Sequence, residues 1–400
     1  MVEPENRNVL EGVRILDLSH FEAGPSCSLL LAFLGAEAIK IESPRHGKSD
    51  RYRFYGEKGN EDIYFVIFNL NKKSITLDIH SEEGRSIFLD LVKKSDVLVE
   101  NFGTDKMREW GLGEKILRKH NPGLIYGCVR GYGSYGPYST YPSLDLTAQA
   151  MGGVMSMTGH DEDDPPLRSG FAIADTVAGT NLALVITGAL YRREKTGQGA
   201  NVEVSLQDSV VNLGRSLMGT YIAYGSKAPK LGNQLKDVVP WNVYQAKEGG
   251  YVAICIINQE MFEKLMDVIG NSHFVEKHDL YSLEKRKQAR EEIEKVLGEW
   301  VSSRTKHEVM TFLCDHGIPC GAVLDSQEIR KDPHLSAREM TVNVQHHEWG
   351  KLKVMGNPLK VHDCPTEIRC SPKLGEHNKE IFSMSHPNSS YRGSSTWKRL

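Results

Sequence analysis

The feature that most constrains the fold is an alternation, through the first half of the chain, of short β-branched runs with helical stretches. Apolar runs lie at 13–18, 38–42, 74–78, 97–99 and 124–129, each separated by a helical length. Pro25 opens a helical run at 26–34 that Gly35 closes, and Ser81 precedes a helix whose apolar residues share one face, namely Ile87, Phe88, Leu91 and Val92. Repeated βαβ units predict an α/β fold with a parallel sheet and a ligand crevice at the carboxyl ends of its strands.

The middle of the chain changes character. A long apolar helix is expected at 175–194, then a strand at 201–206 and a helix at 207–224. Residues 227–236 are basic and contain glycine, as linkers do. Two runs at 241–246 and 251–256 then predict a β-hairpin, followed by helices at 259–269, 283–303 and 306–316.

This order predicts four segments. A large domain occupies 1–226, and a small α+β domain with its linkers occupies 227–335. Strands return at 341–345 and 351–355, so 336–383 forms a C-terminal part. Residues 384–400 are rich in Ser and Asn and are expected to be a flexible tail.

Charge and cysteine content exclude several classes of protein. The 400 residues include 49 Lys and Arg against 52 Asp and Glu, and this balance excludes an electrostatic nucleic-acid binder. Seven cysteines without a Cys-x-x-Cys pair favour free thiols, and Cys314, His316 and Cys320 lack a fourth metal ligand at the usual spacing. The start has no apolar signal region, and no apolar run of transmembrane length lacks a charge or a polar cluster. We therefore expect a cytoplasmic protein without a metal or a membrane partner.

One glycine motif is misleading. Residues 131–136 satisfy the pattern Gly-x-Gly-x-x-Gly after a strand, but Pro137 follows where a helix should begin, and the next acid, Asp145, comes too early. A dinucleotide site is therefore not expected. These glycines instead favour a loop that approaches a ligand closely.

Ordered blocks along the chain resemble the family III CoA-transferases, which include formyl-CoA:oxalate CoA-transferase and the CaiB and BaiF proteins. The resemblance extends to about Asn378. The blocks are residues 10–18 (LEGVRILDL), 23–25 (AGP), 34–42 (LGAEAIKIE), 69–75 (NLNKKSI), 99–102 (VENF), 145–150 (DLTAQA), 170–175 (GFAIAD), 195–199 (KTGQG), 317–321 (GIPCG) and 374–377 (LGEH). In that family two subunits are threaded through one another. The resemblance thus implies an interlocked homodimer whose large Rossmann-like domain is built from both chain ends.

The resemblance also implies the chemistry. The family places its aspartate nucleophile at Asp175, which would attack an acyl-CoA thioester to give an anhydride and then an aspartyl-CoA thioester before CoA passes to a free acid. From the residues alone, Asp175 is the carboxylate that begins a long helix, so an ordinary N-cap is the competing interpretation. Acyl-CoA and a carboxylic acid are then the partners, and no prosthetic group is implied.

Family positions imply the binding residues. The CoA contacts fall on Glu22, Ala23, Leu77, Asn101, Phe102, Gly103, Arg130, Gly131, Tyr132 and Gly133. Two family arginines are replaced by Ser43 and Glu109, where Arg45 and Arg108 could substitute or could be ordinary surface charges. Tyr64 matches a tyrosine of the acid site. Glu22 replaces a glutamine there, so oxalate is not assumed as the acid.

The sequence alone leaves four further points open. The glycine run that covers the site in formyl-CoA transferase is not matched here, where only Gly232, Gly249 and Gly250 are available. Racemases of the same fold carry a His-Asp pair where this chain has Leu144 and Asp145, so an isomerase is a distant alternative because Leu144 cannot shuttle a proton. A catalytically idle CoA-binding homologue is another alternative. Acceptors range from small mono- and dicarboxylates to carnitine or bile acids.

Overall fold

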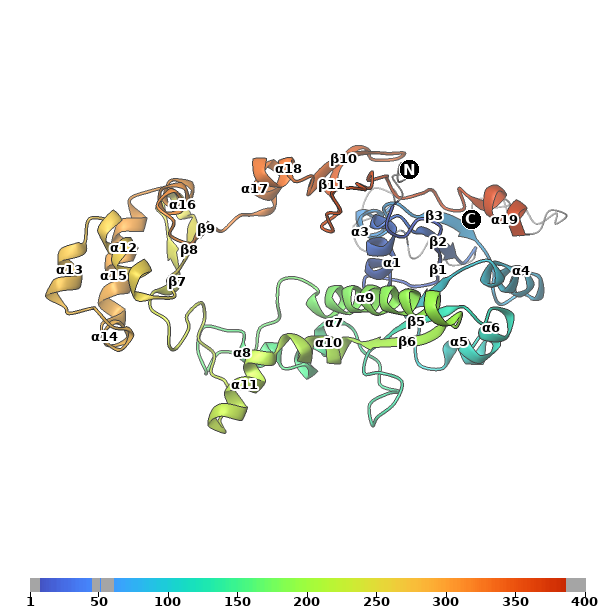
Figure 1. Cartoon of the computed structure of the whole chain (residues 1–400), viewed down its shortest axis with the longest axis horizontal. Coiled ribbons are helices and arrows are strands. Elements are labelled where there is room, and N and C mark those ends of the chain that lie inside the picture. Colours follow the sequence, from blue (N-terminus) through green and yellow to red (C-terminus); the bar gives the residue numbers. More distant parts are fainter. Residues whose placement is uncertain (1–7, 45–50, 52–60, 386–400) are drawn as a thin grey trace. The chain divides into compact units, whose positions relative to one another are not determined.

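A computed structural model describes residues 8–44, 51 and 61–385 of the chain (Figure 1). By their internal contacts these residues fall into two compact units. The larger unit comprises Met1–Met155, Arg168–Gly219 and Pro333–Leu400, and the smaller comprises Ser156–Leu167 and Thr220–Asp332. Each unit is described by itself below.

The larger unit is organised around a six-stranded parallel sheet. Its strands are β1 (Arg14–Asp17), β2 (Glu37–Glu42), β3 (Lys73–Thr76), β4 (Val97–Glu100), β5 (Ile125–Arg130) and β6 (Ala200–Ser205). They lie in the order β3-β2-β1-β4-β5-β6, and the register places Asp17 between Lys40 and Val99. This is the doubly wound order, with a topological switch between β1 and β4. The predicted α/β fold with a parallel sheet is confirmed.

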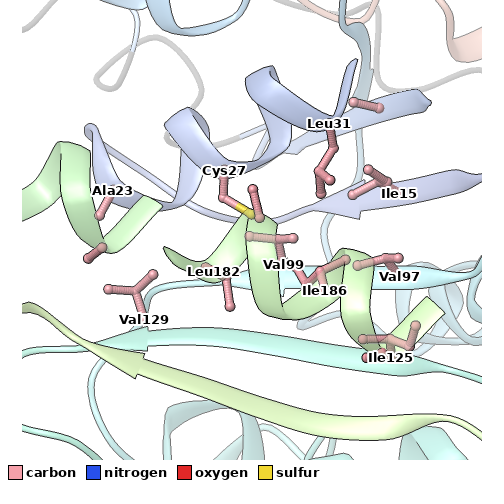
Figure 2. Close-up of a cluster of buried hydrophobic side chains, with 14 of the residues drawn as sticks. Ile15, Ala23, Cys27, Leu31, Val97, Val99, Ile125, Val129, Leu182 and Ile186 are labelled. Carbon is pink, nitrogen blue, oxygen red and sulfur yellow. The ribbon is translucent and has the colours of Figure 1, made fainter. Parts of the chain in front are cut away.

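Side-chain alternation along the strands divides the hydrophobic core between the two faces of the sheet. One face packs against α1 (Ala23–Phe33), α7 (Asp145–Met151), α9 (Ile173–Thr196) and α10 (Leu206–Leu213). Figure 2 shows Cys27 and Leu31 of α1 and Leu182 and Ile186 of α9 against the strand side chains Ile15, Val97, Val99 and Ile125. The other face packs against α4 (Glu82–Lys93), α6 (Glu114–His120) and α19 (Asn378–Ser385).

Short elements complete this unit. They are α3 (Ile63–Phe68), α5 (Lys106–Glu109), α18 (Pro333–Ala337) and an antiparallel pair formed by β10 (Thr341–His346) and β11 (Gly350–Met355). The boundary between the two units falls within the short helix α8 (Val154–Met157), after Met155. Val344 and Val354 of this pair join Phe33 and Val66 in a separate cluster, so the pair packs on α1 and α3.

Several helix boundaries differ from the sequence-based expectation. The helix expected at 207–224 is divided at Gly214 into α10 and α11 (Arg215–Tyr224), and the helix expected at 283–303 is divided near Ala289 into α14 (Leu283–Gln288) and α15 (Arg290–Ser302). A glycine disfavours an uninterrupted helix because its backbone is the most flexible. By contrast, α4 begins as predicted, with the Ser81 hydroxyl accepting the Gly84 N–H at 3.0 Å.

One described helix, α9, is long and apolar enough to cross a membrane by length and composition alone. Its buried residues Ala178, Leu182 and Ile186 belong to the core beneath α1, as Figure 2 shows for the last two. Figure 1 shows the helix running beside β5 and β6. Packing in the protein core therefore accounts for the apolar residues on this side of α9.

The smaller unit is an antiparallel sheet covered by helices. The predicted hairpin is confirmed as β7 (Trp241–Gln245) and β8 (Tyr251–Cys255), joined by the short η1 (Lys247–Gly249), and β9 (Cys320–Ala322) pairs with β8. The helices are α12 (Gln259–Val268), α13 (Ser272–Lys277), α14, α15, α16 (Lys306–Asp315) and α17 (Ser326–Lys331). Its core includes Ile254, Phe262, Leu297 and Leu313, all fully buried.

Candidate active site

A pocket of about 290 Å³ lies where the loops after β1, β4 and β5 converge. Seven of the predicted site residues line it, namely Ala23, Asn101, Phe102, Gly103, Arg130, Gly131 and Asp175. The sequence places them on four separate segments. The parallel sheet brings them to one edge, as expected for the carboxyl ends of strands near a topological switch point.

Asp175 is the third residue of α9. The helix begins at Ile173, two residues before the expected start, and its N-cap is Ala172, which forms no side-chain cap. The competing interpretation of Asp175 as an ordinary N-cap is therefore wrong. The carboxylate of Asp145 caps this helix instead. Oδ1 of Asp145 accepts the backbone N–H of Ala174 at 2.9 Å and that of Asp175 at 3.4 Å. The carboxylate of Asp175 is therefore not needed for capping.

The surroundings of Asp175 disfavour its negative charge. Burial raises the pKa of Asp175 to about 7, and the negative charges of Glu22 and Asp145 contribute to the same shift. Strongly raised carboxyl pKa values within a pocket are typical of functional sites. Near neutral pH a substantial fraction of Asp175 is ionised, and its ionised form is poorly stabilised.

Glu22 precedes α1 and is held by two hydroxyl groups. Its Oε1 accepts from Thr176 Oγ1 at 2.7 Å, and its Oε2 accepts from the Tyr64 hydroxyl at 3.0 Å. Burial raises the pKa of Glu22, and these two donors oppose the shift by stabilising the charged form. The structure thus brings Glu22 and Tyr64 together, and it places both beside the residue that follows Asp175.

Asn101 joins the loops after β1 and β4. Its Oδ1 accepts the His20 N–H at 2.8 Å, and its Nδ2 donates to the His20 carbonyl at 2.7 Å. The Phe102 ring packs 5.3 Å from that of His20 and 4.9 Å from that of Trp110. The side-chain amide of Asn101 therefore shapes the pocket wall, while Phe102 offers an aromatic surface there.

Arg130 is neutralised within the protein. It forms two hydrogen bonds with the Glu100 carboxylate, of 2.5 and 3.0 Å, and a third with the Phe102 carbonyl at 3.0 Å. Only 10% of its side chain is exposed. These contacts fix the loop after β4, and they leave little of the guanidinium free for a phosphate.

The glycine loop after β5 lies close to the pocket without starting a helix. Along the chain, the next helix after this loop is α7, which begins at Asp145. No helix begins within the glycine motif, as predicted when a dinucleotide site was excluded. A side chain at Gly131 would collide with Ser143, because an added Cβ would lie 2.3 Å from the Cβ of Ser143. Gly133 has a φ of +86°. Tyr132 packs against Tyr138 and Tyr141, and Tyr141 also lines the pocket.

Leu77 and Arg108 are two of the predicted CoA contacts that do not line the pocket. The Leu77 side chain is 1% exposed in the core on the opposite sheet face, so only its backbone could meet a ligand. Arg108 is an exposed side chain of α5 that pairs with Asp105 at 2.8 Å. Arg45 lies outside the described residues.

A second group of side chains has metal-ligand composition. Glu61, His346 and His347 lie close enough to share an ion. However, Nδ1 of His346 accepts the N–H groups of Glu348 and Trp349, so its hydrogen is on Nε2, which donates to Glu61 at 2.9 Å. Arg51 also pairs with Glu61. The imidazole and the carboxylate are thus already satisfied, and the arrangement does not favour a metal.

Two contributors to the site lacked a usable sequence signal. Gln149 is fully buried on α7. Its Nε2 donates to Asp145 Oδ2 at 2.6 Å, and its Oε1 accepts the Ser169 N–H at 2.9 Å. Thr176 holds Glu22. The family block at 145–150 contains Asp145 and Gln149, but a single sequence does not show that they contact the segment before Asp175.

The comparisons with known proteins agree with this geometry. The model of CoA-transferase family III matches residues 10–378. A formyl-CoA:oxalate CoA-transferase of Streptomyces coelicolor is 38% identical over 388 residues, covering 93% of this chain and 94% of that protein. One from Rhodopseudomonas palustris is 36% identical, covering 93% and 92%.

Solved structures show the same similarity. The crystal structure of a CaiB/BaiF family protein from Brucella suis superposes with a TM-score of 0.84 and 29% identity, covering 95% of this chain and all of that one. The family match spans most of the chain, and the relatives are matched over nearly their full lengths. The chain therefore belongs to CoA-transferase family III and is an enzyme of the CoA-transferase class.

Proposed function

We propose that this enzyme moves CoA from an acyl-CoA thioester to a free carboxylic acid through covalent intermediates on Asp175. The observation that carries the proposal is the position of Asp175. It lines one pocket with the loops after β1, β4 and β5, at the edge where a doubly wound sheet binds its ligand. The chemistry requires a carboxylate nucleophile, and the thioester is a substrate rather than a resident cofactor.

The proposed sequence has four exchanges. An Asp175 oxygen attacks the thioester carbonyl, the C–S bond breaks, and CoA leaves as its thiolate. The thiolate attacks the aspartyl carbonyl of the resulting anhydride and releases the donor acid as a carboxylate. An acceptor carboxylate then attacks the aspartyl-CoA thioester and expels the thiolate, which finally attacks the acyl carbonyl and restores Asp175. No net proton is consumed.

CoA is proposed to use the predicted residues in different ways. Phe102 offers an aromatic face, whereas Ala23, Gly103 and Gly131 line the pocket with small side chains or none. Gly133 is proposed as a further contact on the loop after β5. Arg108 is exposed and Arg45 is close in sequence to the end of β2, and both remain proposed phosphate contacts. Tyr64 and Glu22 are assigned to the acid side of the site.

The racemase alternative is disfavoured by Leu144. This residue lines the same pocket as Asp175 and has no ionisable group, and none of the described lining residues is a histidine. Proton exchange at an α-carbon needs a base on each face. A catalytically idle homologue is disfavoured because Asp175 is present, half-buried and ionised only at an energetic cost.

We also propose a homodimer, interlocked as the family resemblance implies. Its support is the far side of α9, where Leu184 is 72% exposed and Tyr191 is 66% exposed. A helix that is apolar on all sides is normally covered on all sides. Sedimentation should give the dimer mass at working concentrations, and a stable folded monomer would contradict this. We keep the division into 1–226, 227–335, 336–383 and 384–400 and the cytoplasmic location as proposals.

A donor-by-acceptor screen tests the function. Purified enzyme is incubated with formyl-, acetyl- or succinyl-CoA and with each of a panel of acids, and new acyl-CoA products are followed by mass spectrometry. The relatives are named for formyl-CoA and oxalate, so these are included. Transfer between at least one pair supports the proposal. Hydrolysis alone, or α-carbon proton exchange without transfer, would contradict it.

A further inference from the structure

We infer that Glu22 selects the class of acceptor acid, favouring a monocarboxylate with a nearby hydroxyl donor over a short dicarboxylate such as oxalate. The inference rests on the proposed CoA transfer and names its acceptor more closely. The inferred acceptor class differs from oxalate, for which the relatives are named.

Glu22 is held beside the first turn of α9, which carries the nucleophile. It is 8% exposed, it immediately precedes Ala23 of the pocket lining, and it is bonded to Thr176, the neighbour of Asp175 on α9. The charge of Glu22 is also one of the causes of the raised pKa of Asp175. An acid that approaches the acyl carbon on Asp175 is therefore subject to the charge of a second carboxylate.

The group formed by Glu22, Thr176 and Tyr64 can accept hydrogen bonds but has little capacity to donate them. Thr176 and Tyr64 each carry one hydroxyl hydrogen, and both hydrogens are directed to Glu22, at 2.7 and 3.0 Å. An ionised carboxylate only accepts, and its two oxygens have about four acceptor positions, of which these hydroxyls use two. The remaining acceptor positions of the Glu22 carboxylate can therefore accept hydrogen bonds from a ligand.

The local charge is also unbalanced. In the described parts of the chain, no Lys, Arg or His forms an ion pair with Glu22, Asp145 or Asp175. A second carboxylate on the acceptor would add another anion, which repels its neighbours or must take up a proton. A hydroxyl group at the same place donates to Glu22 instead. The charge and the acceptor positions of Glu22 thus favour a hydroxy monocarboxylate.

Glycolate and oxalate make a size-matched pair of probes, because they differ chiefly in a hydroxymethyl group against a carboxylate. The ratio of kcat/KM for glycolate to that for oxalate is measured with the best donor from the screen. The wild-type enzyme should favour glycolate by at least about tenfold, and Glu22→Gln should lower the ratio by about tenfold because the amide can donate to the second carboxylate.

Matched variants control the result. Glu114→Gln removes a carboxylate from a partly exposed pair with Arg118, on a helix outside the pocket lining, and should leave the ratio unchanged. Glu22→Asp keeps the charge and should keep the preference for glycolate. If Glu22→Gln fails to fold, Glu22→Ser provides the same test, since serine is neutral and can donate.

Two outcomes would overturn the inference. One is a wild-type enzyme that uses oxalate as well as glycolate, and the other is a ratio that Glu22→Gln and Glu22→Ser leave unchanged. In both cases CoA transfer itself would still stand. Failure of every acid to accept CoA from every donor would instead refute the proposed function, and the inference with it.

Discussion

The hydroxyl of Thr176 donates a 2.7 Å hydrogen bond to Oε1 of Glu22, although the two residues are 154 positions apart in the chain. This contact fixes a carboxylate beside the position that follows Asp175. The same carboxylate contributes to the raised pKa of Asp175. Two properties of the enzyme, its pH profile and its stability, should therefore depend on a charge cluster rather than on Asp175 alone.

The first prediction concerns the pH profile. Only the ionised form of Asp175 can attack, and its pKa is raised to about 7, so kcat/KM should rise with pH through a midpoint near 7 and level off about one pH unit above it. Glu22→Gln removes one negative charge and should move the midpoint to lower pH. Initial rates from pH 5 to 9 at constant ionic strength measure both midpoints. A midpoint near 4 in the wild-type enzyme would contradict the assignment.

The second prediction concerns stability. The pKa of Asp175 is higher in the folded state than in the unfolded state, so unfolding releases a proton between these values, and stability falls as pH rises from about 4 to 7. Asp175→Asn removes this cost and should stabilise the fold on the order of 2 kcal/mol at pH 8, and less at pH 5. Urea unfolding at the two pH values checks this. An equal gain in stability at pH 5 and pH 8 would show that ionisation of Asp175 is not the cause.

The third prediction concerns Asp145, which caps the helix that carries Asp175. Asp145→Ala leaves the N–H groups of Ala174 and Asp175 without this acceptor, so it should cost about 1 kcal/mol of stability and at least about tenfold in kcat/KM. The midpoint of the pH profile should also move down, because a negative charge is lost. Asp145→Asn keeps an oxygen for these N–H groups and should retain more activity. Equal rates in the two variants would argue against positioning.

The strands and the nucleophile could be predicted from sequence because their signals are local. The β-branched runs at 13–18 and 97–99 correspond to β1 and β4, and the family block at 170–175 contains Asp175. The Asp145 cap, the Glu22–Thr176 bond and the Asn101–His20 bonds join residues 29 to 154 positions apart. Such contacts depend on tertiary packing and leave no periodic pattern. The division at Gly214 was missed because the apolar pattern continues across it.

The fourth prediction concerns the buried Arg51. Its guanidinium bonds both oxygens of Glu42 at 2.7 Å and also pairs with Glu61, and it is 1% exposed. Arg51→Met leaves two buried carboxylates without this partner and should cost about 3–5 kcal/mol. Lys93→Met, which removes an exposed pair with Asp90, should change stability by less than about 0.5 kcal/mol. Similar losses in both variants would contradict the role assigned to burial.

Detection of CoA on Asp175 tests the central claim most directly. Enzyme mixed with an acyl-CoA donor in the absence of an acceptor is quenched in acid and digested with trypsin, and the peptide 169–192, which contains Asp175, is analysed by mass spectrometry. The proposed mechanism predicts this peptide with CoA in thioester linkage at Asp175, and no adduct in Asp175→Asn, whose transfer rate should fall by several orders of magnitude. Turnover without the adduct, together with more than a few per cent of wild-type transfer in Asp175→Asn, would contradict the account.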